Sequence, residues 1–240
     1  MILNLRSRDV RRDLADCHEM HRTLMKTFPD LKGTQGKARE EFGLLYRVES
    51  LRKSGEIVIY VQSEKQPDWS SLPIGYLTET VKENPACKPI AEKYAQMKEG
   101  QVLSFALRAN PTRKVGNSLK SERQAGKKNN GRRIFLTKSE DQIEWLKRKA
   151  VRGGFEILAL QKEPTLPDMD VRPSDKITGR HRRITAEKED AREDFLVFKG
   201  VLYQGRLRIT NMEQFLTTLA GGIGSGKAYG FGLLSLAPPR

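Results

Sequence analysis

Along the first hundred residues, the hydrophobic positions follow a helical period in one segment and form short strand-like runs in others. Between residues 11 and 28, apolar side chains recur every three or four positions, which predicts one amphipathic helix ended by Pro29. Shorter apolar runs, separated by a turn at 53–56, predict strands. The expected elements are a strand at 1–5, the helix at 11–28, strands at 42–48 and 57–62, and a short closing strand at 89–94.

The second half of the chain shows the same order of periods. The expected elements are a strand at 101–109, a basic loop at 114–133, a helix at 139–151 with Ser139 as its N-cap, strands at 155–160 and 195–202, a helix at 211–220, a glycine loop at 221–232 and a last strand at 233–236. This β-α-β-β-α-β order is typical of ferredoxin-like, RNA-recognition-type units. We therefore predict an α+β protein of two tandem ferredoxin-like domains, 1–99 and 100–240.

Composition supports a folded chain. Of the 240 residues 37% are hydrophobic, which is enough to build a core. No uncharged run reaches the ~18 residues of a membrane span, and the N-terminus lacks the apolar stretch of a signal peptide. Cys17 and Cys87 match no zinc or disulfide pattern, so we expect reduced thiols and a cytoplasmic protein.

The formal net charge of +14 is unevenly divided between the halves. Residues 1–100 carry a net +2 and residues 101–240 a net +12. The excess lies in two clusters, at 108–133 and at 172–183, among Gly, Pro, Asn and Ser residues that indicate loops. Such clusters favour a polyanion such as nucleic acid, because binding to phosphates releases counterions. Charge that only confers solubility is the alternative, although it would not require the halves to differ.

The glycine loop has several possible interpretations. Residues 221–228 nearly match a Walker A loop, but Ala228 replaces the Ser or Thr that would hold magnesium, and only 13 residues follow Lys227. Residues 229–236 partly match the RNP1 signature of RNA-recognition motifs. A tight turn into the last strand is the purely structural alternative. A loop in which the glycine backbone and Lys227 approach a phosphate is the functional one.

Four collinear segments resemble one known family, the CRISPR repeat-processing endoribonucleases, and most closely its type I-E Cascade (CasE) branch. They are residues 11–24, 105–111 (Phe-Ala-Leu-Arg-Ala-Asn-Pro), 141–146 (Asp-Gln-Ile-Glu-Trp-Leu) and 221–238 with its Gly-Ile-Gly and Gly-Phe-Gly triplets. The resemblance implies two ferredoxin-like domains and metal-independent cleavage of a hairpin RNA, without a cofactor. It also implies partners, namely the CRISPR repeat stem-loop and the other Cascade subunits.

The resemblance also implies site residues. His21 falls on the family's catalytic histidine, which would take the proton of a 2′-hydroxyl, whereas from its position in an apolar stripe a hydrogen-bonded core histidine is the alternative. His18, on the same helical face, stands where the family commonly has tyrosine, and Lys26 falls on a supporting lysine that could also be a solvated surface residue. The expected RNA-binding residues are Arg108, Arg113, Lys127, Lys128, Arg132, Arg133, Arg172, Lys176, Gly224, Gly226 and Lys227.

Two rival functions stay open at this point. One is an RNA-binding subunit of the same fold without catalysis, which the charge distribution fits equally well. The other is a nucleotide-binding enzyme that uses the glycine loop and Lys227.

Overall fold

The computed structural model describes residues 1–30, 38–114, 133–183 and 192–239, with side chains described outside 181–193. The predicted basic loop at 114–133 therefore lies almost wholly outside the described residues. The helices are α1 (Arg8–Ala15), α2 (Cys17–Met25), α3 (Ala38–Glu41), α4 (Ala91–Ala95), α6 (Ser139–Arg152) and α7 (Met212–Gly221), with 3-10 turns η1 (Trp69–Ser71) and η2 (Lys227–Tyr229). The strands are β1 (Leu45–Ser50), β2 (Ile57–Gln62), β3 (Val102–Ala109), β4 (Thr112–Lys114), β5 (Arg133–Phe135), β6 (Phe155–Ile157), β7 (Met169–Arg183), β8 (Arg192–Ile209) and β9 (Leu234–Ala237).

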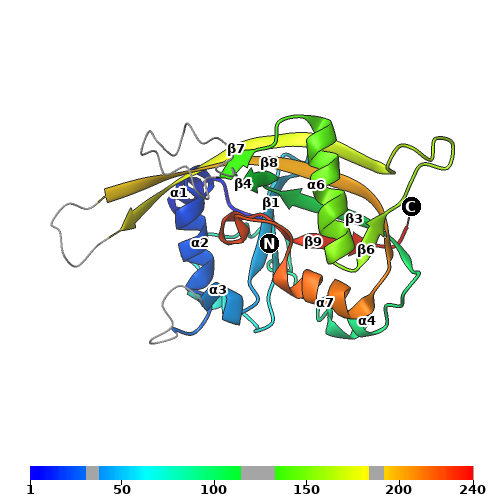
Figure 1. The fold of residues 1–240 in the computed structure, drawn as a ribbon. Helices are drawn as coiled ribbons and strands as arrows, with labels where there is room; N and C mark the ends of the chain where they lie inside the picture. The colour runs from blue at the N-terminus through cyan, green and yellow to red at the C-terminus, as the bar shows by residue number, and fades with distance from the viewer. Residues whose placement is uncertain (31–37, 115–132, 184–191, 240) are drawn as a thin grey trace, which may run out of the picture.

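The second half forms an antiparallel sheet in the order β6-β8-β3-β9, and β7 pairs with β8 from Arg192 to Gly205. If β3, β6, β8 and β9 are counted as the first to fourth strands, this is the strand order of a ferredoxin-like unit. Side chains of β3 alternate between buried and half-buried, as expected for a strand with one face on a core. Helices α6 and α7 lie on the sheet (Figure 1), where Trp145 and Phe215 join the buried cluster.

The first half repeats this order with shorter pieces. β1 pairs with β2, Ile2 bridges to Val58 of β2, and Leu3 bridges to Leu77. The predicted strand at 1–5 is thus reduced to two single bridges. A second core gathers around Leu24, Phe42 and Tyr46 and shares no buried residue with the first. The α+β, ferredoxin-like prediction is confirmed, and the division after residue 99 stays a prediction.

The expected strand at 89–94 is wrong, because this segment contains α4. Its sequence, Ala-Glu-Lys-Tyr-Ala, consists largely of good helix formers and lacks the alternation of a half-buried strand. Tyr94 packs against the core of the second half and donates a hydrogen bond to Gln62 Oε1 at 3.1 Å. The bridge at Leu77 takes the place of the fourth strand.

The single helix predicted at 11–28 is two helices, broken at Asp16. This residue is extended (φ −134°, ψ 110°), and its side chain accepts hydrogen bonds from the backbone N–H groups of His18 and Glu19. Asp16 therefore ends α1 and serves as the N-cap of α2. The N-cap prediction for α6 is also wrong by one residue, since Lys138 occupies that position without a side-chain cap and Ser139 is the first helical residue.

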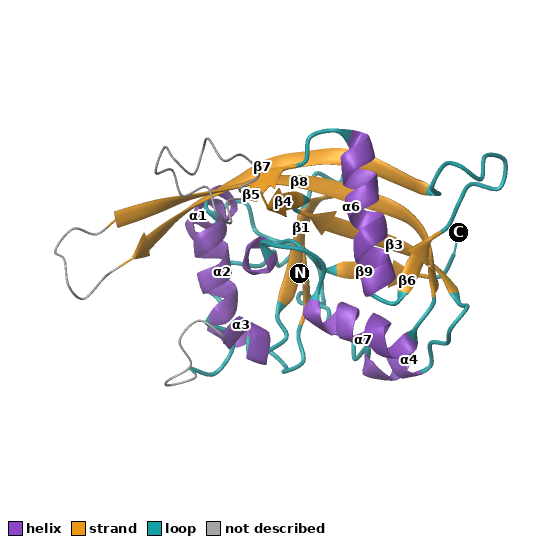
Figure 2. Cartoon of the chain, in the orientation of Figure 1, coloured by secondary structure: helices purple, strands orange, loops and turns teal. Residues whose placement is uncertain are grey.

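Strands β7 and β8 form a long hairpin that extends past α1 and α2 (Figure 2). The second basic cluster therefore lies on a strand, and the expectation of a loop is wrong. Pro173, which cannot donate to a ladder, stands where the register shifts before Lys176, so the strand accommodates it at an irregularity.

Buried polar contacts join the two halves. Arg47, 4% exposed, pairs with Glu49 and donates through Nη1 to Ala106 O at 3.2 Å and to Ser235 Oγ at 3.0 Å. Tyr46 donates to Ala228 O of the glycine loop at 3.1 Å. These bonds hold β1 against β3, β9 and the loop. None of the described helices combines the length and apolar character needed to cross a membrane.

Candidate functional site

Helix α2 carries two histidines on one side. His18 and His21 are three residues apart and therefore neighbours on the helix surface. Cys17, Met20 and Leu24 are the buried neighbours of His21 on α2, so His21 lies at the edge of the core and His18 lies one step further from it. Both histidines are half-buried.

The glycine loop brings an aromatic ring against both histidines. The ring centroid of Tyr229 lies 6.0 Å from that of His21 and 6.4 Å from that of His18. Phe198 of β8 supports Tyr229 from another side at 5.1 Å. Tyr229 is not among the site residues predicted from the sequence, although an aromatic residue between the glycines of a candidate phosphate loop was an available signal.

The hairpin is fixed to the start of the histidine helix. Asp16 Oδ2 accepts a hydrogen bond from the backbone N–H of Arg180 in β7 at 3.1 Å, while Oδ1 caps α2. A Cβ at Gly179 would lie 2.7 Å from the Cys17 sulfur, so only glycine permits this approach. Burial raises the pKa of Cys17 to about 12, which keeps the thiol protonated and excludes it as a nucleophile at neutral pH.

The glycine loop is shaped by close packing. Gly224 and Gly226 have φ of +88° and +79°, and a Cβ on either would lie 3.0 Å from the ring of Trp145 or of Phe231. The loop leads into η2 and then β9, with no helix after it. The Walker A interpretation is therefore wrong, because a P-loop opens a helix whose N-terminus faces the phosphates.

The pKa of His21 is lowered to about 4, first by burial and then by the positive charges of His18 and Arg39. His21 is thus a neutral imidazole at pH 7. Its Nδ1 is buried and has no hydrogen-bond partner among the described residues. A buried imidazole beside a second one can accept or pass a proton, which is the chemistry of general acid–base catalysis.

We expect this histidine to contribute to acid unfolding. The unfolded chain binds the proton with a pKa near 6.5 and the folded chain only near 4, so stability is lost as pH falls through this range. This difference in pKa corresponds to a loss of about 3 kcal/mol in the free energy of unfolding as the pH falls from 7.5 to 4. Urea unfolding measures the free energy of unfolding at each pH. Between pH 7.5 and pH 4 this free energy should fall less for His21→Gln than for the native protein. Equal losses would contradict the assignment.

The predicted lysines occupy different places. Lys26 is the exposed C-cap of α2, and its side chain makes no hydrogen bond or ion pair with the described residues. Lys227 begins η2 and is half-buried. Burial, followed by the charges of Arg39 and Lys149, lowers the pKa of Lys227.

Arg108 is engaged by the protein. Its guanidinium donates to Ser174 Oγ at 2.9 Å and to Asp175 O at 3.2 Å, and it lies 5.4 Å from the centre of the Phe231 ring. Burial lowers its pKa. These contacts tie β3 to β7, so the structure places Arg108 in a supporting position.

The remaining predicted basic residues divide into three groups. Arg113 and Arg133 are exposed on the paired strands β4 and β5, near Gly224. Arg172 and Lys176 are exposed on β7, where Arg172 pairs with Asp170. The third group lies outside the described residues: Lys127, Lys128 and Arg132.

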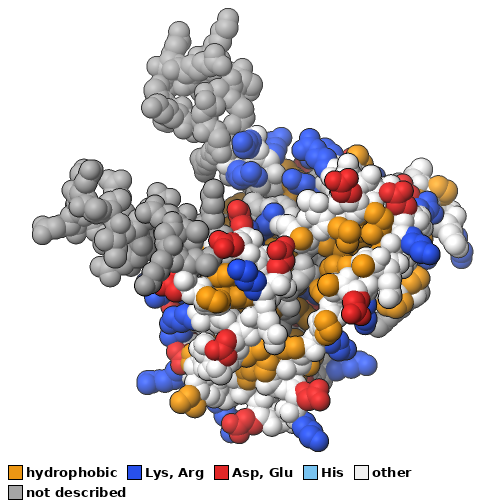
Figure 3. Space-filling model, turned by 90° about the horizontal axis from the view of Figure 1, so that it is seen from below, with side chains coloured by type: hydrophobic (Ala, Val, Ile, Leu, Met, Phe, Trp, Pro, Cys, Tyr) orange, Lys and Arg blue, Asp and Glu red, His pale blue; other side chains and the backbone are white. Residues whose placement is uncertain are grey.

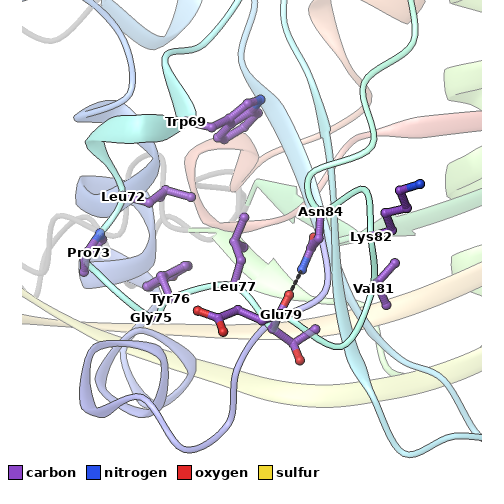
Figure 4. Close-up of a pocket in the computed structure, with 11 residues that line it drawn as sticks. Trp69, Leu72, Pro73, Gly75, Tyr76, Leu77, Glu79, Val81, Lys82 and Asn84 are labelled. Carbon is purple, nitrogen blue, oxygen red and sulfur yellow. Dashed lines mark hydrogen bonds between the residues drawn. The ribbon is translucent and has the colours of Figure 1, made fainter.

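A separate pocket of about 450 Å³ lies in the first half, between η1 and residue 84 (Figure 4). Trp69, Leu72 and Tyr76 line one part of it, and Asn84 closes another part with a hydrogen bond from Nδ2 to Thr78 O at 2.9 Å. None of the predicted site residues lines this pocket. Within the described residues, no group of three or more His, Cys, Asp or Glu side chains is placed to hold a metal ion.

Comparison with known proteins finds a matching family and relatives over nearly the whole chain. The family described as "CRISPR associated protein" matches residues 1–238. CRISPR-associated endoribonuclease Cse3 of Thermus thermophilus is 35% identical over 238 residues, 99% of this chain and 98% of that protein. The CRISPR system Cascade subunit CasE of Escherichia coli K12 is 27% identical over 225 residues, 93% of this chain and 92% of that protein. The structure of CRISPR endoribonuclease Cse3 bound to a 19-nucleotide RNA matches with a TM-score of 0.69 at 34% identity, covering 99% of this chain and 97% of that one.

Proposed function

The chain belongs to the CRISPR-associated family that includes the endoribonuclease Cse3 and the Cascade subunit CasE, and from this premise we propose a reaction and a site for it. It is an endoribonuclease that cuts CRISPR precursor RNA at the base of the repeat hairpin. It acts in the cytoplasm and stays on its product as a Cascade subunit. The observation that carries the proposal is the half-buried, neutral His21, which faces Tyr229 of the glycine loop.

The reaction is an internal transfer at phosphorus. His21 takes the proton of the 2′-hydroxyl next to the scissile phosphate, and the 2′-oxygen forms a bond to phosphorus. The bond from phosphorus to the 5′-oxygen breaks, and that oxygen receives a proton. The products are a 2′,3′-cyclic phosphate and a 5′-hydroxyl. No water is consumed, so neither a water nucleophile nor a metal that would activate one is required.

The environment of His21 suits a base that acts on an anion. In the free protein its pKa of about 4 leaves the imidazole unprotonated at pH 7. A phosphodiester bound beside it brings negative charge, which favours the imidazolium and raises the pKa towards neutrality. His21 therefore becomes a stronger base once RNA is bound. His18 lies close enough on the same face to orient the phosphate or to protonate the leaving oxygen.

Tyr229 completes the surface against which the scissile nucleotide would rest. Burial, followed by the charges of Cys17 and Asp16, raises the pKa of its phenol, so it keeps its proton and can donate a hydrogen bond. Exposed cations on the hairpin and on β4 and β5 supply the phosphate contacts: Arg172, Lys176, Arg113 and Arg133. Arg108 positions β7 through Ser174.

Cleavage in the presence of excess EDTA tests the proposed reaction. We expect a repeat-hairpin RNA to be cut once, at the base of the stem, with the same rate in EDTA and in magnesium. The upstream product should end in a 2′,3′-cyclic phosphate and the downstream product in a 5′-hydroxyl, identified by mass spectrometry. Loss of cutting in EDTA, or a 5′-phosphate on the downstream product, would overturn the mechanism.

A further inference from the structure

A small basic pocket lies between α6, the β4–β5 pair and the glycine loop. Its volume is about 280 Å³, and five of the nine residues that line it are cationic while none is acidic. The lining residues are Thr112, Arg113, Arg133, Trp145, Arg148, Lys149, Arg152, Gly224 and Ser225. Three of these cations, on α6, have no place in the proposed reaction: Arg148, Lys149 and Arg152.

The cations of this pocket lack negative partners. None of the five forms an ion pair with a carboxylate in the part of the chain that the structure describes, whereas Lys147 on the same helix pairs with Glu144 at 3.1 Å. The pKa of Lys149 is lowered, first by burial and then by Arg152 and other cations around it. On the face of the molecule seen from below, by contrast, basic and acidic side chains are interspersed (Figure 3). The pocket thus concentrates positive charge that an anion would neutralise.

The glycine loop, which lines the same pocket through Gly224 and Ser225, carries backbone N–H groups without a hydrogen-bond partner among the described residues. The N–H groups of Gly224, Ser225 and Gly226 donate no hydrogen bond to any described residue. Positive φ at Gly224 and Gly226 on either side of Ser225 is typical of a nest, in which successive N–H groups converge on an anion. The Ser225 hydroxyl is already held by Asn110, which leaves the backbone as the free donor.

The basic residues near the C-terminus of α6 also have a purely structural explanation, but it does not account for the whole pocket. Cations in the last turn of a helix interact favourably with its dipole. This covers Lys149 and Arg152, which lie in that turn. It does not explain why Arg113 of β4 and Arg133 of β5 line the same pocket, nor why Gly224 and Ser225, whose N–H groups donate no hydrogen bond to any described residue, line it as well.

We propose that this pocket binds a phosphodiester of the RNA strand other than the scissile one. The inference rests on the proposed function and adds Arg148, Lys149 and Arg152 to the residues that hold the substrate. The volume is below the ~300–1,000 Å³ of typical small-molecule sites, so it fits a phosphodiester with part of its ribose. Trp145 is 5% exposed and stacked on Tyr203, so its ring is not free to stack a base.

The chain itself links this pocket to the histidines. Ser225 lines the pocket and Tyr229 contacts His21, and four residues of backbone span at most ~14 Å. A strand of a few nucleotides can therefore occupy both places. This continuity favours RNA over the carboxylates of a partner protein, which would have no reason to lie beside the catalytic histidine.

The test compares RNA binding by two variants that lose the same charge. The pocket variant is Arg148→Gln/Lys149→Gln/Arg152→Gln, and the control is Arg52→Gln/Lys53→Gln/Lys98→Gln, at exposed positions outside the pocket. The probe is a repeat-hairpin RNA with a 2′-deoxy nucleotide at the cut. We expect the pocket variant to bind about 10-fold more weakly at 0.15 M salt, with a salt slope smaller by about 1–2, and the control to change less than about 2-fold.

Single neutral methylphosphonate linkages then locate the phosphate. At one position of the RNA, the neutral linkage should weaken binding by the native protein and by Arg148→Lys/Arg152→Lys, which keep the charges. The same linkage should not further weaken RNA binding by the pocket variant. Equal RNA binding by the pocket variant and the control variant would overturn this inference, and so would the absence of any position at which the neutral linkage has this effect. The proposed function would stand in either case if the native protein still cuts the RNA. A native protein that neither binds nor cuts the hairpin would overturn both the inference and the proposed function.

Discussion

A hairpin RNA with one 2′-deoxy nucleotide directly before the cut is expected to bind with unchanged affinity and not to be cut. In the proposed reaction the 2′-oxygen is the nucleophile, so its removal leaves nothing to attack phosphorus. Contacts to phosphates and to the stem do not depend on this oxygen. The expected change is complete loss of cleavage at that bond with a dissociation constant within about 2-fold of the all-ribose RNA.

The measurement is a single-turnover time course with the two RNAs at saturating protein in EDTA. A hairpin with the 2′-deoxy nucleotide one position further upstream is the matched control, and it should be cut at the normal rate. Cleavage of the modified bond at a similar rate would show that water or another group attacks phosphorus, and it would remove His21 from the role of base for a 2′-hydroxyl.

Replacing His21 by alanine is expected to lower the single-turnover rate by ~10²–10⁴-fold while hairpin RNA still binds, because a positioned general base contributes a factor of this size. The side chain is half-buried at the edge of the α2 core, and its Nδ1 makes no hydrogen bond with the described residues, so the substitution breaks no described bond. The rate and the dissociation constant should be measured on the same RNA.

Two controls separate catalysis from structure. Arg22→Ala, at the next, exposed position of α2, should leave the rate at saturating protein within a few-fold. Free imidazole should restore part of the activity of His21→Ala, since it can act as a diffusible base. An unchanged cleavage rate for His21→Ala would remove His21 from the role of general base. Hairpin binding by the native protein without any cleavage would favour the alternative of an RNA-binding subunit without catalysis.

Elements whose pattern arises from local burial could be predicted well from the sequence. The strand at 57–62 is confirmed with the same bounds as β2, and the helix at 139–151 is one residue short of α6. The break at Asp16 was missed because its flanking residues continue the helical spacing, while the cap that divides α1 from α2 depends on one carboxylate. The strand expected at 89–94 lacked strand periodicity and depended on the assumed order of elements.

The site was only partly accessible to sequence reasoning. The histidines share a helix, so their spacing alone places them together. Tyr229 meets them through long-range packing, in which Tyr46 holds the carbonyl of Ala228 across 182 positions of the chain. The α6 cations near Gly224 follow an ordinary pattern for a helix end. Only the tertiary structure shows that they share a pocket with Gly224 and Ser225, whose N–H groups donate no hydrogen bond to any described residue.

The bond between Asp16 and the hairpin has an evolutionary consequence. One carboxylate both starts the histidine helix and holds the backbone of β7 at Arg180, and Gly179 allows the approach to Cys17. Asp16, Cys17 and Gly179 can therefore not drift independently. The hairpin can adapt to a new repeat sequence through its exposed cations, but the part that crosses α2 must be inherited together with the helix. Under the proposed function, we therefore expect RNA specificity to diverge in the part of the hairpin away from α2, while the part beside the histidines is preserved.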